Sequence, residues 1–319
     1  MATAEQILSL IKSHTREDRE HFYTVALQIA SYEARRGHQN FADDIRKAFV
    51  TRASEKREAI AIPDNLRDIV VMRSPEERFS QLVLGEHNKR RLDRVVREYV
   101  KQEVLKQHGL GNRRKVLLSG PPGTGKTMTA GAIANTLCLP LFSIQLDMIL
   151  SRYMGESSAK LHMVFDFISK HKALYLFDEF DTLGGDRGND DIGEMRRILN
   201  TLLLCIEQDA SKSLIFAATN KPEMLDRAIF RRFDDFIIYE LPNKDAIVSL
   251  IHNTLAAFLP DNINLEKIAS DYEGLSCAEV VKACEDAAKL SLLESHPYVT
   301  QKMLELSFND LSTMFKIRK

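Results

Sequence analysis

The stretch that decides the fold reads Gly120-Pro121-Pro122-Gly123-Thr124-Gly125-Lys126-Thr127. It fits the pattern G-x-x-x-x-G-K-[ST] at every position, follows an apolar strand pattern at 115–119 and precedes a helical pattern that begins near Lys126. The glycines let the backbone turn several N–H groups onto phosphate oxygens, and the amino end of the next helix adds partial positive charge. The stretch therefore predicts a loop for the phosphates of ATP, with Lys126 on the β- and γ-phosphates and Thr127 on Mg²⁺.

A second apolar stretch, at 174–177, runs directly into Asp178 and Glu179. Two acids at the end of a buried strand need a partner, because the core penalises unpaired charge. A magnesium ion supplies one, so we expect Asp178 to orient the magnesium shell and Glu179 to polarise the attacking water. The alternative is a pair of solvated acids. A protein that only binds nucleotide does not need the second carboxylate, so the pair predicts hydrolysis of ATP to ADP and phosphate.

A third apolar stretch, at 214–218, ends in Thr219 and Asn220. In a parallel sheet, neighbouring strands deliver their carboxyl-terminal residues to the same crevice. Asn220 is therefore predicted to hold the attacking water together with Glu179.

The order of apolar strand and helix patterns divides the chain. Strand patterns at 115–119, 141–144, 174–177, 214–218 and 236–239 alternate mostly with helices, which predicts an α/β fold with a parallel sheet covered on both faces. We expect a three-helix bundle at 1–60, a linker at 61–80 around Pro63 and Pro75, and a large ATPase domain at 81–241. A charged helix should run from about 87 to 107. Four helical patterns follow, at about 243–258, 264–270, 276–293 and 300–315, and predict a small helical lid domain at 242–319.

The composition is that of an ordinary globular chain of 319 residues, 44% of them apolar and 28% charged. The net charge of −1 creates no global field that would attract nucleic acid or a membrane surface. No apolar run has the length of a signal peptide or a bilayer span. The four cysteines are scattered, without a CxxC pair, which is typical of a reducing compartment. We expect a cytoplasmic protein without a membrane span.

These three strand ends together resemble the AAA branch of the AAA+ ATPases, over roughly residues 80–319. The stretch LDRAIFRRFD at 225–234 resembles that branch's second region of homology, with the tandem arginine seen in katanin, spastin and their relatives. The resemblance implies that Arg231 and Arg232 act as fingers in the neighbouring subunit's nucleotide site. It also implies a small bacterial-type or stand-alone member that forms a single hexameric ring on ATP. The alternative is a basic loop that pairs with Asp234 and Asp235.

The stretch RYMGES at 152–157 resembles the first pore loop of substrate-threading AAA proteins. The resemblance implies that Tyr153, Met154 and Gly155 grip an extended polypeptide in a central channel; the alternative is that Tyr153 packs against its own domain. The stretch GGDRGN at 184–189, followed by an arginine pair at 196–197, resembles the second pore loop. Glu194 lies one residue closer to that pair than in relatives.

The stretch GLSCAE at 274–279 resembles the family's Gly-x-Ser-Gly-Ala-Asp, with mild changes at Cys277 and Glu279. The lid is therefore expected to touch adenine and ribose without a charged sensor, opposite a wall formed by Leu84 and Gly85. Motifs and resemblance together imply these nucleotide-binding residues: Gly120, Pro121, Pro122, Gly123, Thr124, Gly125, Lys126, Thr127, Met128, Asp178, Leu84, Gly85 and Ala278.

Three functions compete at this stage. The first is a chaperone-like hexameric ATPase that remodels, unfolds or threads a protein substrate. The second is an ATP-dependent regulator or adaptor of a separately encoded effector, such as a protease or toxin, which docks on the bundle at 1–60. The third, a DNA-dependent loader, is less favoured, because the basic cluster at 89–97 is interleaved with acids.

Overall fold

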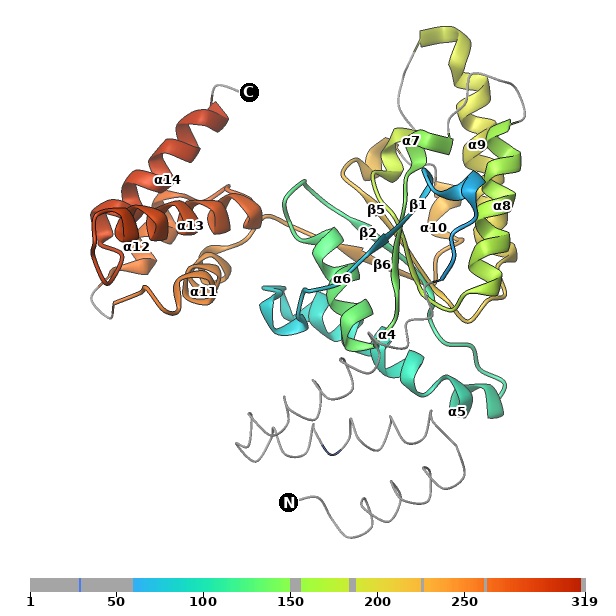
Figure 1. The fold of residues 1–319 in the computed structure, drawn as a ribbon, viewed down its shortest axis with the longest axis horizontal. Helices are drawn as coiled ribbons and strands as arrows, with labels where there is room; N and C mark the ends of the chain where they lie inside the picture. Colours follow the sequence, from blue (N-terminus) through green and yellow to red (C-terminus); the bar gives the residue numbers. More distant parts are fainter. Residues whose placement is uncertain are drawn as a thin grey trace. The chain divides into compact units, whose positions relative to one another are not determined.

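The computed structural model divides the chain into two compact units, residues 1–61 and 62–319 (Figure 1). It describes Ile29 and residues 60–149, 156–183, 188–224, 227–260 and 263–316. The predicted three-helix bundle at 1–60 lies almost wholly outside these described residues. Within them, no helix is long and apolar enough to cross a membrane.

A six-stranded sheet forms the centre of the second unit, and its strand order is β1-β3-β4-β5-β2-β6. All neighbours pair in parallel except β1, which is antiparallel to β3. Every residue of β3, β4 and β5 is buried, as expected for strands covered on both faces. The predicted α/β fold with a parallel sheet is therefore confirmed. The strands are β1 (Val70–Arg73), β2 (Lys115–Ser119), β3 (Leu141–Ile144), β4 (Leu174–Phe177), β5 (Leu214–Thr219) and β6 (Asp235–Ile238).

The segment 61–80 is not the linker that the sequence predicts. Its residues Val70–Arg73 form β1, the edge strand beside β3, and the short 3-10 helices η1 (Asp64–Leu66) and η2 (Phe79–Gln81) flank it. The apolar run Ile69-Val70-Val71-Met72 is as long as the run that marks β4, although only Val70 of β1 is buried. Pairing with β3 stabilises the strand.

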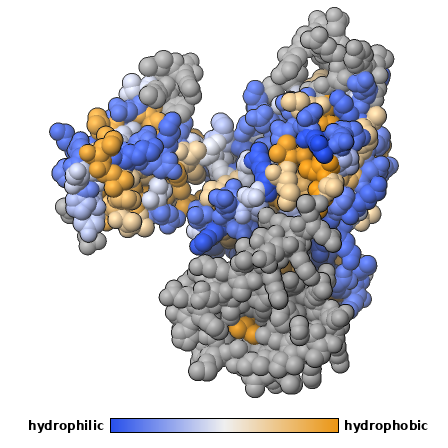
Figure 2. Space-filling view, viewed as in Figure 1, coloured by the Kyte–Doolittle hydropathy of each residue, from blue (hydrophilic) through white to orange (hydrophobic). Residues whose placement is uncertain are grey.

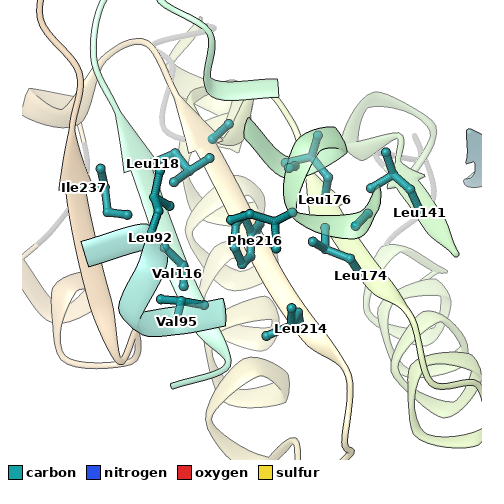
Figure 3. Close-up of a cluster of buried hydrophobic side chains, with 14 of the residues drawn as sticks. Leu92, Val95, Val116, Leu118, Leu141, Leu174, Leu176, Leu214, Phe216 and Ile237 are labelled. Atoms are coloured by element: carbon teal, nitrogen blue, oxygen red, sulfur yellow. The ribbon is translucent and has the colours of Figure 1, made fainter. Parts of the chain in front are cut away.

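Helices cover both faces of the sheet (Figure 1). On one face, alternate side chains of the central strands pack against Leu92 and Val95 of α4 and Ile133 of α6 (Figure 3). On the other face, Phe142 stacks on Tyr175 with ring centroids 5.3 Å apart, and Phe165 of α8 stacks on Phe177. The helices of this α/β domain are α4 (Glu86–Val100), α5 (Gln102–Gln107), α6 (Lys126–Thr136), α7 (Leu146–Ile149), α8 (Glu156–Lys170), α9 (Gly188–Gln208) and α10 (Arg227–Phe230).

The charged helix predicted at 87–107 is broken into α4 and α5 at Lys101. Two of its basic side chains pair with acids, in line with the interleaved charges of the sequence. Arg94 binds Glu98 at 2.9 Å, and Arg91 binds the buried Asp235 at the start of β6. This cluster therefore packs and pairs within the domain.

The four helices predicted after Pro242 are all present and bury an apolar core of their own. Side-chain caps begin all four: Asn243 accepts from the N–H of Ala246, Asn264 from that of Lys267 and Thr300 from that of Met303, and Ser276 forms a capping box with Glu279. We call these helices the helical domain: α11 (Lys244–Leu255), α12 (Leu265–Asp271), α13 (Cys277–Leu293) and α14 (Gln301–Lys316).

Polar and apolar side chains are interspersed on the visible surface, with apolar patches on both the α/β domain and the helical domain (Figure 2). Large apolar side chains of the helical domain that are more than half exposed are Leu292, Leu293, Tyr298 and Leu306.

Candidate functional site

The glycine-rich loop connects the end of β2 to the start of α6. Gly120, Gly123 and Gly125 have φ values of 149°, 74° and 95°, a region that other residues rarely adopt. At Gly120 an added Cβ would also lie 2.2 Å from the carbonyl oxygen of Tyr239. The hydroxyl of Thr124 donates to the Pro121 carbonyl at 2.8 Å and fastens the turn. The backbone conformation therefore favours glycine at all three positions, and close packing also requires it at Gly120.

Lys126 begins α6 and is buried inside the loop. Its ammonium Nζ donates to the carbonyls of Gly120 and Pro121, each at 2.7 Å. Burial lowers the pKa of Lys126, while the carboxylates of Asp178 and Asp181 act in the opposite direction. A cation thus lies inside the loop at the amino end of a helix, where an anion binds most favourably.

Thr127 and Asp178 meet although they come from α6 and from the end of β4. The Thr127 hydroxyl donates to Oδ2 of Asp178 at 2.8 Å. Among the described residues, no group of three or more His, Cys, Asp or Glu side chains could hold a metal by itself. One hydroxyl beside one carboxylate fits Mg²⁺, which usually takes one or two protein oxygens together with substrate phosphates and water.

Glu179 follows Asp178 in an unusual backbone conformation. Its φ of 51° lies in the left-handed region, and its N–H donates to Oδ1 of Asp178 at 2.9 Å. The side chain is exposed, and it lines a cavity of about 160 Å³ together with Gln145 and Thr182. Strain of this kind at a non-glycine residue clusters at functional sites. The turn leaves the second acid exposed after the end of β4, at the cavity that it lines.

Asn220 lies at the same edge of the sheet, because β5 runs between β4 and β2. The N–H of Gly120 donates to the carbonyl of Thr219 at 3.2 Å, so the phosphate loop and the end of β5 are directly joined. The three strand ends singled out in the sequence therefore converge. Asp181, which no sequence motif singles out, accepts hydrogen bonds from Thr219 and Asn220; its only signal in the sequence is a third acid close to Asp178 and Glu179.

Arg231 and Arg232 are not brought to this edge. They lie between α10 and β6, and Asp234 donates its N–H to the carbonyl of Lys115 at the start of β2. The phosphate loop follows the other end of β2, about 13 Å further along the strand. Arg231 is exposed, whereas Nε of Arg232 binds Glu207 at 3.2 Å. The arginines therefore lie at the amino ends of the parallel strands, whereas their own subunit's phosphate loop lies at the carboxyl ends.

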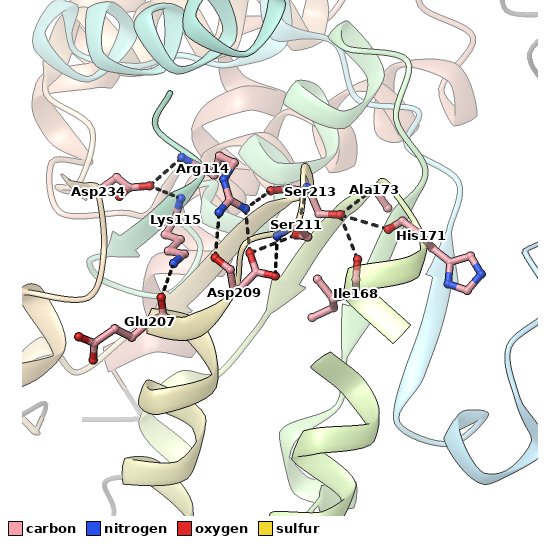
Figure 4. Close-up of polar contacts among 10 residues, drawn as sticks. All are labelled: Arg114, Lys115, Ile168, His171, Ala173, Glu207, Asp209, Ser211, Ser213 and Asp234. Atoms are coloured by element: carbon pink, nitrogen blue, oxygen red, sulfur yellow. Dashed lines mark hydrogen bonds and ion pairs between the residues drawn. The ribbon is translucent and has the colours of Figure 1, made fainter. Parts of the chain in front are cut away.

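A polar network holds these amino ends of the strands together (Figure 4). The Asp234 carboxylate accepts from the N–H groups of Arg114 and Lys115, at 2.8 and 2.9 Å. Arg114 also forms a buried ion pair with Asp209 at 2.8 Å, and the Lys115 ammonium donates to the Glu207 carbonyl at 3.2 Å. These contacts join the end of α9, the start of β2 and the arginine segment. The predicted pairing of the basic loop with Asp234 is not among them, since Asp234 binds backbone N–H groups.

The helical domain touches the phosphate loop through the start of α13. The N–H of Ala278 donates to the Gly123 carbonyl at 2.9 Å, and a Cβ on Gly123 would lie 2.6 Å from Oγ of Ser276. Val83 packs against the core of the helical domain, while the next residue, Leu84, packs against the sheet core. Leu84 and the following Gly85, which precedes α4, thus lie where the two cores approach each other.

Other predicted residues cannot be placed in this site. Tyr153, Met154 and Gly155 of the first pore-loop motif lie outside the described residues, as does 184–187 of the second. Met128 is half-buried in the first turn of α6.

Fold and site define the class of P-loop ATPases, because a phosphate loop, a magnesium-type oxygen pair and a strand-end acid meet at one edge of a parallel sheet. Residues 116–241 match the family model described as "ATPase family associated with various cellular activities (AAA)". An uncharacterized AAA family ATPase of Sinorhizobium fredii, y4kL, is 34% identical over 97% of this chain and 96% of its own length. The chain therefore belongs to the AAA family and hydrolyses ATP.

Two further relatives match over part of their length. The meiotic spindle formation protein mei-1 of Caenorhabditis elegans is 36% identical over 55% of this chain and 39% of its own. A 26S proteasome regulatory subunit 8 homolog of Encephalitozoon cuniculi is 32% identical over 64% of this chain and 55% of its own. Each of these two alignments leaves much of the relative unmatched.

Proposed function

We propose that the chain assembles on ATP into a hexameric ring and couples hydrolysis to the remodelling, unfolding or threading of a protein substrate. The position of Arg231 and Arg232 carries this proposal. They lie at the opposite end of the strands from their own phosphate loop, so in this proposal they complete the site of a neighbouring subunit and not their own. An arginine supplied in trans raises phosphoryl-transfer rates by about 10³–10⁵.

In the proposed reaction, Lys126 binds the β- and γ-phosphates, Glu179 polarises the attacking water and Asn220 holds that water in line. Thr127 and Asp178 would hold Mg²⁺, which neutralises charge on the phosphate oxygens when it is bound. The loop N–H groups and the helix end behind them act on the same anion. The arginine pair of the neighbour then stabilises the charge that develops in the transition state.

The relatives and the surface support the assembly and its protein substrate. One relative is named as a proteasome regulatory subunit and another as a meiotic spindle formation protein. Leu292 and Leu293 are exposed neighbours at the end of α13, and we propose that another chain covers them in the assembly. Tyr153, on the pore-loop motif, is the residue we propose to grip the substrate.

Mixing two inactive variants tests the shared site. Glu179→Gln removes the acid, and the double variant Arg231→Ala/Arg232→Ala removes the fingers. A mixed ring contains sites with an intact Glu179 on one side and intact arginines on the other, so the mixture should regain part of the wild-type ATPase rate. A mixture that hydrolyses ATP only at the sum of the two separate rates contradicts the proposal.

Lys126→Ala is the matched control for this mixing experiment. Lys126 and Glu179 both belong to the subunit that binds the nucleotide, and the arginines come from its neighbour. A mixture of these two variants therefore contains no complete site and should stay inactive. Recovery in this control would mean that subunit mixing stabilises the variants in some other way.

A second candidate function is the regulation of a separately encoded effector. The compact unit at 1–61 favours it, since it is separate from the ATPase unit, and the Sinorhizobium fredii alignment spans most of it. The Glu179→Gln chain should retain ATP and its bound proteins, which mass spectrometry can identify. If the full-length trap retains a specific protein that a chain lacking residues 1–61 does not, that unit docks the partner; equal recovery by both contradicts this candidate.

A further inference from the structure

Asp181 has no role in the reaction proposed above, although it lies two residues after the catalytic acid. It belongs to the 3-10 helix η3 (Phe180–Leu183), which follows β4. Its Oδ1 accepts two hydrogen bonds from the end of β5: one from the hydroxyl of Thr219 at 3.2 Å and one from the N–H of Asn220 at 3.1 Å. One carboxylate oxygen thus joins the turns that follow two neighbouring strands.

Thr219 extends this connection to the phosphate loop. The residue is fully buried, its carbonyl accepts the N–H of Gly120, and its hydroxyl oxygen accepts the N–H of Lys221 at 3.1 Å. The hydroxyl proton is therefore committed to Asp181, and the two N–H groups that follow β5 both have side-chain acceptors. Hydrogen bonds therefore hold the backbone before, at and after Asn220.

The same short helix fixes Glu179. The N–H of Thr182 donates to the Glu179 carbonyl at 2.9 Å, which closes the turn in which Glu179 takes its left-handed conformation. Asp181 lies inside this closed turn. A displacement of its carboxylate would therefore move Asn220 relative to Glu179.

The hydrogen bond from the Asn220 N–H to Asp181 satisfies a backbone donor that the strand pairing does not. β5 ends at Thr219, so the N–H of Asn220 lies beyond the strand and needs an acceptor from elsewhere in the chain. A carboxylate is a stronger hydrogen-bond acceptor than a neutral carbonyl, so this bond holds the backbone N–H more firmly. It fixes the backbone of Asn220 at the edge of the sheet where the phosphate loop begins.

We propose that Asp181 is a positioning residue for ATP hydrolysis, which holds Asn220 in register with Glu179 and the phosphate loop. The inference rests on the proposed role of Asn220 at the attacking water. Asp181 itself does not touch the substrate; it acts through the backbone of Asn220.

Kinetics of Asp181→Ala in the full-length chain test this proposal. Misplacement of a reacting group by about 1 Å costs about 10²-fold in rate, so kcat should fall by about 10- to 100-fold. KM for ATP should change by less than about threefold, because the phosphate loop and Lys126 are intact. A parallel loss of nucleotide affinity would indicate general damage to the site and overturn the proposal.

Asp181→Asn is the matched variant, since its amide oxygen can still accept both hydrogen bonds. It should retain kcat within about threefold of wild type if the role is positioning by hydrogen bonds. A rate as low as that of Asp181→Ala overturns this assignment. Thr219→Val removes one of the two donors and keeps the volume, so it should give a smaller loss than Asp181→Ala, and it reports on the same contact if the alanine variant does not fold.

A double-variant cycle separates this inference from the proposed role of Asn220. If Asp181 acts through Asn220, then Asp181→Ala should reduce kcat little further in an Asn220→Ala background. Losses that multiply overturn the inference. If Asn220→Ala alone leaves kcat at the wild-type value, the role of Asn220 fails; if only Asp181→Ala is without effect, the positioning role alone fails.

Discussion

The hydroxyl of Thr127 donates a 2.8 Å hydrogen bond to Oδ2 of Asp178, although the two residues are 51 positions apart in the chain. α6 supplies the first and the end of β4 supplies the second. The contact exists because β5 alone separates β4 from β2, the strand that leads into the phosphate loop. It places two hard oxygen ligands side by side at the start of a helix.

Removal of either oxygen should weaken the binding of Mg²⁺ before it affects the fold. We expect Thr127→Val and Asp178→Asn to raise the Mg²⁺ concentration needed for half-maximal ATPase activity by about tenfold or more, since each removes one contact to the ion or its hydration shell. Titration of Mg²⁺ at saturating ATP measures this. Thr127→Ser keeps the hydroxyl and should stay close to wild type; a shift as large as that of Thr127→Val would contradict the assignment.

Gly123→Ala should impair nucleotide binding through the contact with the helical domain. The residue has a φ of 74°, and its new Cβ would lie 2.6 Å from the Ser276 hydroxyl that caps α13. Backbone strain and the displaced cap should raise the Kd for ATP by about tenfold or more, which corresponds to about 1.4 kcal/mol. Gly111→Ala is the control, because a Cβ at Gly111 meets nothing within 4 Å. Equal affinities of the two variants would contradict this reading.

Stability at high pH should depend on Tyr239. Burial raises the pKa of this phenol, whose hydroxyl donates to Thr129 at 2.7 Å. The phenol therefore contributes stability that is complete below its unfolded pKa of about 10 and is lost as pH rises toward the higher folded pKa. Tyr239→Phe should cost about 1 kcal/mol at neutral pH and lose less stability than wild type above about pH 10. Urea unfolding against pH measures both; the exposed Tyr298 supplies the control variant Tyr298→Phe, and an unchanged pH slope in Tyr239→Phe would contradict the prediction.

The parts of the site that the sequence predicts are those written in continuous local patterns. The glycine loop carries its own backbone requirements, and the strands before Asp178 and Asn220 are uninterrupted apolar runs. Because parallel strands end at one edge, the meeting of these residues follows from the fold class alone. The alternation of strand and helix patterns was therefore enough to predict that Thr127, Asp178 and Asn220 lie at one edge of the sheet.

The parts that the sequence does not reveal depend on pairing between distant segments. β1 lies in a short apolar run with one buried residue, and its place in the sheet depends on antiparallel pairing with β3, which the run alone does not indicate. Asp181 and Glu207 look like ordinary surface acids until β5 and the arginine segment are placed beside them. The break at Lys101 likewise leaves a helical pattern on both sides, so residue spacing alone does not locate it.

The two arginines of the proposed finger pair should contribute unequally. Arg231 is exposed, whereas Arg232 is 31% exposed and its Nε binds Glu207 at 3.2 Å, at the end of α9. We expect Arg231→Ala to lower the ATPase rate of the assembled protein by about 10³-fold, as for loss of a finger, and Arg232→Ala to lower it less. Glu207→Ala should reproduce the effect of Arg232→Ala. The two changes combined should lower the rate little more than either alone, because both break the same ion pair. Rates measured at several protein concentrations separate loss of assembly from loss of catalysis. A larger defect in Arg232→Ala than in Arg231→Ala, or losses that multiply in the Glu207→Ala/Arg232→Ala double variant, would show that Arg232 does not act through its ion pair with Glu207.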